Sequence, residues 1–380
     1  MNTKLPKNKK ALISSLSDWM FPLLILAVFF LLLIFSDTAI NYMKKGLALC
    51  AVAVIPSLFP FMVISDLTVR SGIGIKVSRV LRFPMRLLFG VNEAGASAYI
   101  LGALCGFPIG ALTLVKTYEK GEMSKCELER LMTFCNNPGS AFVISAVGVS
   151  LMGDKRIGIL IYTSVLLSSV LIGIACRFIY PKATRIHTKE SQSKVGLSAT
   201  DFTDSMRSSA LSMLGVCSYV VFFSSIIGCV GAIVKMLGAP DELTATIFGF
   251  FELSSGVSAA SAVGNRETAT VLCALFTGWS GLSVHFQIMS VCMGNDISFK
   301  PFIIAKAVQG ILCATFTYIV IKLFPSLLVC DSDVLFQKDH ISFSTWSVMS
   351  LALFAMAVLI LLYKKAPTSA KLRRKRIFKK

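Results

Sequence analysis

Phe134-Cys135-Asn136-Asn137-Pro138-Gly139-Ser140 and Phe276-Thr277-Gly278-Trp279-Ser280-Gly281-Leu282 are two polar breaks in otherwise apolar sequence. In each stretch a Phe precedes a Gly by five residues. The hydrocarbon core of a membrane has no water to satisfy the backbone groups that a helix break frees. Such a break therefore persists only where protein covers it or where it lines a wet cavity. A matched pair of breaks, one in each half of the chain, is typical of transporters, so the two stretches predict a transport site.

The composition of the chain is that of a polytopic membrane protein. Of its 380 residues, 55% are hydrophobic and 15% are charged, and the mean hydropathy is +0.74. The formal net charge is +18, and a basic tail covers 364–380. Beside a membrane helix such a tail is a positive-inside signal that also contacts anionic lipid headgroups. We therefore expect the lipid bilayer as a partner, and no nucleic acid.

Apolar runs divide the chain into segments of membrane length. The regular runs are 19–36, 46–67, 157–180, 209–237, 302–324 and 341–363. The runs that Gly, Pro, Ser or Asn interrupts are 94–115, 131–152, 243–263 and 268–293. Short cytoplasmic loops carry an excess of Lys and Arg, which distinguishes full crossings from re-entrant hairpins. If 94–115 and 243–263 are re-entrant, most of the basic loops and both termini are cytoplasmic.

We therefore predict an all-α polytopic membrane protein with about eight full spans. It contains two inverted repeats, each with a re-entrant helical hairpin and a broken transmembrane helix. Such folds bind their substrate near the bilayer midplane. The predicted units are an N-terminal tail with the first helix at 1–45, repeat one at 46–180, a cytoplasmic linker at 181–208, repeat two at 209–324, and a C-terminal helix with the basic tail at 325–380.

The two hairpin tips and the two breaks hold the candidate binding residues. Gly permits the left-handed backbone of a tight turn, and a helix that restarts after a break favours an anion at its N-terminus. Trp279 offers a face on which a flat aromatic acid could stack, and Ser254 or Ser255 can cap the helix that leaves the second tip. The predicted substrate-binding residues are Gly106, Pro108, Gly110, Asn136, Asn137, Pro138, Gly139, Glu252, Ser254, Ser255, Gly256, Thr277, Trp279, Ser280, Gly281, His285 and Gln287.

Ionisable residues at membrane depth are functional candidates because they are costly to bury. Glu252 is the strongest of them, as a ligand for a coupling H+ or Na+, although a hydrogen-bonded clamp on its hairpin is an equal alternative. His285 is a candidate proton relay or a structural hydrogen-bond partner. Lys235, Lys306 and Lys322 are near helix ends, so we expect their ammonium groups to extend to the membrane surface.

No enzyme activity, cofactor or metal is expected. The sequence contains no nucleophile–base set and no phosphate-binding loop. Its eleven Cys are scattered singly, which is typical of packing residues rather than of disulfides or zinc ligands. A single Gly or Pro kink is ordinarily a packing feature too, but the recurrence of kinks at matching places favours a binding site.

Five motifs within 46–324 form a specific set: Cys105-Gly-Phe-Pro-Ile-Gly-Ala111, Phe134-Cys-Asn-Asn-Pro-Gly139, Phe251-Glu-Leu-Ser-Ser-Gly256, Phe276-Thr-Gly-Trp-Ser-Gly-Leu-Ser-Val284 and Ile297-Ser-Phe-Lys-Pro-Phe-Ile-Ile-Ala-Lys306. This set resembles the sporulation integral membrane protein YlbJ (SpoVV) family. The family belongs to the nucleoside-recognition, or Gate-domain, group and is similar in architecture to concentrative nucleoside transporters. Many of its members have Lys after the Gly-Ala of the first tip, where this chain has Leu112.

The resemblance implies movement of dipicolinic acid from the mother cell across the outer forespore membrane, and a requirement for the spore cortex. We accordingly expect a transporter of a small anionic solute in the cell membrane or the outer forespore membrane. The alternatives are a symporter of nucleosides or other small metabolites, and a non-transporting membrane protein of spore-envelope assembly. The sequence leaves the coupling ion and the oligomeric state open.

Overall fold

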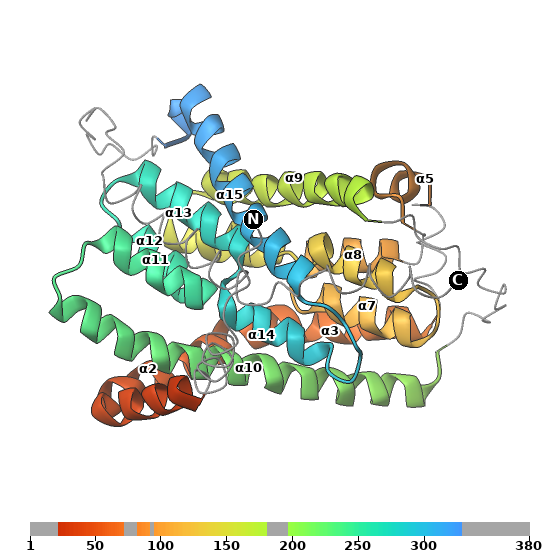
Figure 1. Cartoon of the computed structure of the whole chain (residues 1–380), viewed down its shortest axis with the longest axis horizontal. Coiled ribbons are helices and arrows are strands. Elements are labelled where there is room, and N and C mark those ends of the chain that lie inside the picture. Colours follow the sequence, from red (N-terminus) through yellow and green to blue (C-terminus); the bar gives the residue numbers. More distant parts are fainter. Residues whose placement is uncertain (1–21, 72–81, 92–94, 181–196, 329–380) are drawn as a thin grey trace, which may run out of the picture.

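A computed structural model of the chain describes residues 22–71, 82–91, 95–180 and 197–328. All regular elements in these ranges are helices, which agrees with the all-α prediction (Figure 1). The predicted C-terminal helix at 341–363, the basic tail and most of the predicted linker lie outside the described residues.

The N-terminal part consists of a helix at Pro22–Ile34, α2 (Ser36–Leu49), the π-helical segment η1 (Cys50–Val54) and α3 (Ile55–Arg70). The first helix and the next are bent by 96°. The helical segment that contains the predicted second span at 46–67 begins earlier than that span, because the chain is already helical from Ser36. Gly46 lies against the side chain of Ser224 on α10, so the absence of a Cβ lets the two helices approach closely.

The next part contains α5 (Arg82–Pro84), η2 (Met85–Phe89), α6 (Ala96–Cys105), α7 (Ile109–Glu119), α8 (Lys125–Cys135), η4 (Phe142–Leu151) and α9 (Lys155–Ile179). Helices α6 and α7 pack against each other as a hairpin, as the sequence predicts for 94–115. Ser124 caps α8 by accepting a hydrogen bond from the backbone N–H of Glu127, which a polar residue at this position commonly does.

The last part contains α10 (Ala199–Met236), α11 (Asp241–Phe251), α12 (Leu253–Ser261), α13 (Arg266–Trp279), α14 (Gly281–Val291), α15 (Lys300–Leu323) and η5 (Pro325–Leu328). Helices α11 and α12 form the second hairpin. Helix α10 begins at Ala199, so part of the segment assigned to the linker 181–208 is helical. A capping box between Ser198 and Asp201 fixes that start.

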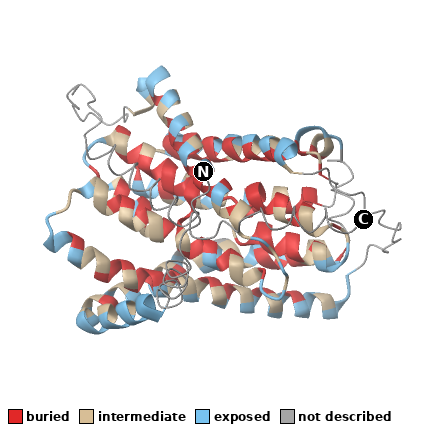
Figure 2. Cartoon of the chain, in the orientation of Figure 1, coloured by how far each residue is buried: buried red, intermediate tan, exposed pale blue. Residues whose placement is uncertain are grey.

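Four helical segments in the described ranges are long and apolar enough to cross a membrane, or five if the bent N-terminal pair counts as one span. They are α9, α10, α13 with α14, and α15. Figure 2 shows buried residues concentrated in inner helices such as α8 and α13, and exposed residues along α2 and the outer side of α10. Leu211 and Leu214 on α10 are more than 60% exposed. A large apolar outer surface of this kind is expected where lipid covers the protein.

The two predicted repeats contact each other reciprocally. Helix α7, the second arm of hairpin one, packs against α14, which follows the break of repeat two. In the same way α12, the second arm of hairpin two, packs against η4, which follows the break of repeat one. The last helix of each predicted repeat also contacts the other repeat. Helix α15 of repeat two contacts α8 of repeat one, and α9 of repeat one contacts α13 of repeat two. This exchange brings both breaks and both tips into the centre of the helix assembly.

Ion pairs join loops that the charge pattern assigns to one membrane face. Lys125 pairs with Asp296 at 2.7 Å, so the loop before α8 lies beside the loop before α15. At the face predicted to lie opposite, Lys322 pairs with Glu267 at 3.0 Å. The contacts agree with the predicted grouping of loops, whereas the number of full spans and the orientation of the repeats in a membrane remain predictions.

Candidate functional site: two helix breaks and two hairpin tips

The tip of hairpin one lies directly on the first break. Helix α6 ends at Cys105, and Gly106 has φ 93°, a left-handed conformation that favours glycine. A Cβ on Gly106 would lie 2.5 Å from the backbone N of Gly139, and a Cβ on Gly102 would lie 1.9 Å from the carbonyl O of Cys135. Backbone therefore contacts backbone here, and the glycines are required for the approach.

At the first break two asparagines replace the missing helical hydrogen bonds. Helix α8 ends at Cys135, and Nδ2 of Asn136 donates to the carbonyl O of Met132 at 3.0 Å. Nδ2 of Asn137 donates to the carbonyl O of Phe134, also at 3.0 Å. These amides satisfy carbonyl groups that the end of the helix leaves without partners. The break at Asn136–Gly139 is thus confirmed, and helical structure resumes at Ser140, two residues after Pro138.

Lys306 extends into this break from α15 and is fully buried, with 0% exposure. Its Nζ donates to the carbonyl O of Asn136 at 3.0 Å and to Oε1 of Gln309 at 2.8 Å. Nε2 of Gln309 in turn donates to Oδ1 of Asn137 at 2.7 Å. The expectation that Lys306 extends to the membrane surface is wrong, because polar groups of the break receive its ammonium inside the protein. The spacing of Lys306 and Gln309 predicts that the two side chains are neighbours on one helix, but it does not predict that they meet the first break.

At the second tip Glu252 is the cap of α12. It has extended backbone between α11 and α12, and its carboxylate accepts hydrogen bonds from the backbone N–H of Ser254 at 2.9 Å and of Ser255 at 2.6 Å. The serines were predicted to cap this helix, and that prediction is wrong: they contribute their backbone N–H groups, whereas Glu252 supplies the acceptor. The geometry matches the clamp alternative for Glu252, which is 3% exposed.

The second tip lies on the second break, as the first tip lies on the first. Ser280 has φ 75° and Gly281 has φ 73°, so the chain turns sharply between α13 and α14. A Cβ on Gly281 would lie 2.8 Å from the backbone N of Leu253 at the start of α12. A break within the predicted segment Thr277–Gly281 is therefore confirmed, but the predicted start is too early, because α13 continues through Thr277 and ends only at Trp279.

The aromatic ring of Trp279 is enclosed by other rings. It stacks on Phe250 with a centroid distance of 5.7 Å and an interplanar angle of 11°, and the ring of His285 lies 4.3 Å away. Nε1 of Trp279 donates to the carbonyl O of Phe250 at 3.0 Å, and the residue is 0% exposed. The stacking pose predicted for a flat acid therefore requires that Phe250 or His285 moves from its place in this structure.

The hydroxyl groups near the second break bond to helix carbonyls. Thr277 Oγ1 donates to the carbonyl O of Cys273 at 2.5 Å, and Ser280 Oγ donates to that of Thr277 at 3.4 Å. Gln287 donates to Ser283 Oγ, also at 3.4 Å. In this conformation these predicted binding groups are occupied by the protein itself.

Two buried polar atoms in the region have no hydrogen-bond partner among the described residues: Oδ1 of Asn136 and Nε2 of His285. Nδ1 of His285 lies 2.6 Å from the carbonyl O of Gly281, so Nδ1 carries the proton and Nε2 of the neutral ring is an acceptor. His285 packs on Phe302 at 5.1 Å, and Phe302 lies one helical turn before Lys306 on α15. Unpaired buried polar atoms are rare in proteins and indicate a place for water or a polar ligand.

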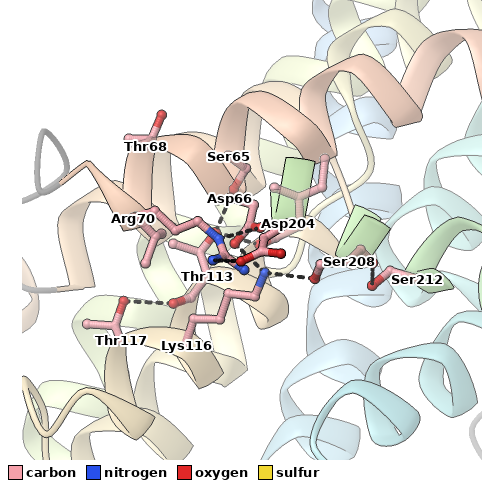
Figure 3. Close-up of polar contacts among 12 residues, drawn as sticks. Ser65, Asp66, Thr68, Arg70, Thr113, Lys116, Thr117, Asp204, Ser208 and Ser212 are labelled. Carbon is pink, nitrogen blue, oxygen red and sulfur yellow. Dashed lines mark hydrogen bonds and ion pairs between the residues drawn. The ribbon is translucent and has the colours of Figure 1, made fainter. Parts of the chain in front are cut away.

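A second polar cluster lies at the end of the molecule where α3, α7 and α10 meet (Figure 3). The carboxylate of Asp66, 1% exposed, is 2.5 Å from Nζ of Lys116 and 3.0 Å from Nε of Arg70. Arg70 also lies 3.7 Å from Asp204, and Lys116 Nζ donates to Ser208 at 3.4 Å. No local pattern in the sequence indicates this cluster, because its charges come from three segments far apart in the chain.

Across the described residues there is no group of three or more His, Cys, Asp or Glu side chains that could hold a metal ion. Glu252 remains a candidate ligand for H+ or Na+ by its position alone. No carboxylate of the described part of the chain forms an ion pair with Lys306.

No protein-family model matches the chain, and no solved structure matches it. The sporulation integral membrane protein YlbJ of Bacillus subtilis (strain 168) is 26% identical over 340 residues, which cover 79% of this chain and 83% of the relative. The similarity extends over most of both proteins and agrees with the motif set at the tips and breaks. The chain is therefore similar over most of its length to the sporulation integral membrane protein YlbJ, as the motif set suggests.

Proposed function

We propose that this protein is a membrane transporter of a small anionic solute in sporulation. The observation that carries the proposal is the repeated contact between a hairpin tip and a helix break: Gly106 lies on Gly139 in repeat one, and Gly281 lies on Leu253 in repeat two. Helix breaks at membrane depth need cover, and the tips supply it. A cover made by a hairpin that can move relative to its break also provides a gate for a central site.

The reciprocal packing of the two halves supports the inverted repeat on which this mechanism depends. Helix α15 of repeat two contacts α8 of repeat one, and α9 contacts α13 in return. Alternating access in such folds is a rocking of one repeat, or of a bundle formed from both, around a fixed central site. The buried polar atoms near both breaks provide groups that such a site would expose to a solute.

Dipicolinic acid is the proposed solute, because the family resemblance implies it and because its two carboxylates are anionic near neutral pH. The relative's name places that protein in sporulation, and we extend that context to this chain. We propose the cell membrane or the outer forespore membrane as its location, with both termini cytoplasmic.

Uptake into proteoliposomes tests the proposal. Purified protein is reconstituted, and the entry of labelled dipicolinate and labelled uridine is measured against protein-free vesicles. Saturable entry of dipicolinate, with little entry of uridine, is the expected result. The reverse selectivity would identify a nucleoside symporter, and no protein-dependent entry of either solute would contradict transport and favour the assembly role.

A further inference from the structure

We propose that the ammonium group of Lys306 binds a carboxylate of the transported solute, an inference that rests on the proposed function. Lys306 lies on α15 at 0% exposure, and its Nζ reaches the first break by donating to the carbonyl O of Asn136. Lys306 is thus a cation inside the protein, and its hydrogen-bond partners are uncharged.

The hydrogen bonds of Lys306 leave capacity for a ligand. An ammonium has three N–H donors. Two acceptors, the carbonyl O of Asn136 and Oε1 of Gln309, lie within hydrogen-bonding distance of Nζ. Both are neutral, so the positive charge lacks a counter-charge within the described part of the protein. Burying a charge without an opposite charge is unfavourable, and a bound carboxylate would remove that cost.

Two other buried charges, the carboxylates of Asp66 and Glu267, show the contrast. Asp66 is buried to the same degree, but two cations, Lys116 and Arg70, are within 3.0 Å of its carboxylate. Lys322, on the same helix as Lys306, pairs with Glu267 at 3.0 Å. In both cases the protein supplies the opposite charge from its own sequence, whereas at Lys306 it supplies only dipoles.

The surroundings of Lys306 are those of a site rather than of a packed core alone. Oδ1 of Asn136 and Nε2 of His285 are buried without partners among the described residues. Asn136 bonds directly to Lys306, and His285 contacts Phe302, one turn earlier on α15. These unsatisfied acceptors are places for water or for a proton that accompanies the anion, whereas Lys306 holds the charge.

The assignment also provides a positive charge near the first tip, where this chain has Leu112 and many members of the family that it resembles have Lys. Leu112 is buried and apolar, so this position supplies no cation. Lys306 brings a positive charge to the same break from the opposite repeat. The anion site thus takes its charge from α15 and its shape from hairpin one.

Binding of dipicolinate to the purified protein, measured by titration calorimetry, tests the assignment. Lys306→Met keeps the length of the side chain and removes its charge, and we expect affinity to fall by about 10- to 100-fold, the usual effect of losing a hydrogen bond to a charged group. Lys306→Arg keeps the charge and is expected to retain measurable binding. Lys322→Met, on the same helix, is the matched control and should bind as the wild type does.

Unchanged affinity in a folded Lys306→Met protein would overturn the assignment while leaving transport intact. If that variant does not fold, Lys306→Gln, which retains an amide donor for Asn136, takes its place with the same expected loss. The uncharged dimethyl ester of dipicolinate should bind weakly to the wild type and equally weakly to the Met variant. A wild type that neither binds nor transports any carboxylate would overturn the proposed function and this assignment together.

Discussion

Nζ of Lys116 on α7 lies 2.5 Å from Oδ1 of Asp66 on α3, and this contact ties the second arm of hairpin one to the N-terminal part of the protein. Asp66 is almost fully buried, and Arg70 completes its ion pairs from the next turn of α3. The cluster, drawn in Figure 3, thus anchors one end of the hairpin, while the tip at the other end lies on the first break.

Asp66→Asn should destabilise the protein by about 2 kcal/mol, below the 3–5 kcal/mol typical of breaking a fully buried pair, because Lys116 and Arg70 both reach solvent. The readout is the midpoint of thermal unfolding in detergent. Asp204→Asn is the control, since Asp204 is mostly exposed and its 3.7 Å contact with Arg70 should contribute less than about 1 kcal/mol. Equal midpoints for the two variants would show that the Asp66 cluster is not an anchor.

Gly102→Ala should separate hairpin one from the first break. Its Cβ would lie 1.9 Å from the carbonyl O of Cys135, so backbone has to shift, and overpacking of this kind commonly costs about 1–3 kcal/mol. Gly215→Ala on α10 is the control, because no atom lies within 4 Å of its added Cβ and Ala favours a helix. Thermal unfolding of the two variants should therefore change in opposite directions.

Glu252→Ala removes the acceptor that caps α12, and a lost N-cap typically costs about 1 kcal/mol. Ser255→Ala retains the backbone N–H that donates to Glu252, so its stability should change little. Unfolding midpoints of the purified variants check this difference. A larger effect of the serine substitution would restore the serine cap that the sequence predicts.

Cysteine labelling tests the membrane orientation. In a Cys-free background, Glu190→Cys in the predicted linker should react with a membrane-impermeant maleimide only from the cytoplasmic side. Ala262→Cys, at the exposed end of α12, should react only from the opposite side. Labelling of both positions from one side would contradict the re-entrant hairpins, because it would place the linker and the loop after hairpin two on the same face.

Much of the fold follows from local chemistry and could be read from the sequence. The Asn136–Gly139 segment interrupts a helix because Asn, Pro and Gly there disfavour continued helical backbone, and the second break lies at Gly281, where the backbone is left-handed. Gly106 turns where a left-handed residue is needed. Boundaries were less certain: α10 begins at Ala199, before the apolar run at 209–237, because a polar capping box rather than hydrophobicity fixes its start.

The candidate site was predictable in place but not in its contacts. Glu252 rather than a serine caps α12, because its longer side chain can turn back to two N–H groups at once. Trp279 was predicted to offer an open face, but the rings of Phe250 and His285 already pack against its ring. The surroundings of Trp279 could not be read from residue types, since they depend on how α11 and α14 meet around α13.

The membrane class of this protein, the places of its helix breaks and its resemblance to the YlbJ family follow from the sequence alone, because apolar length, Pro and Gly placement and motif spelling are properties of the chain. The tertiary structure decided which groups meet at those breaks. Lys306 bonds to Asn136 across 170 residues, and no local pattern encodes that distance. A backbone carbonyl that a helix break leaves free can accept a hydrogen bond from any donor that lies near it. Which donor lies near it depends on how helices distant in the sequence pack together.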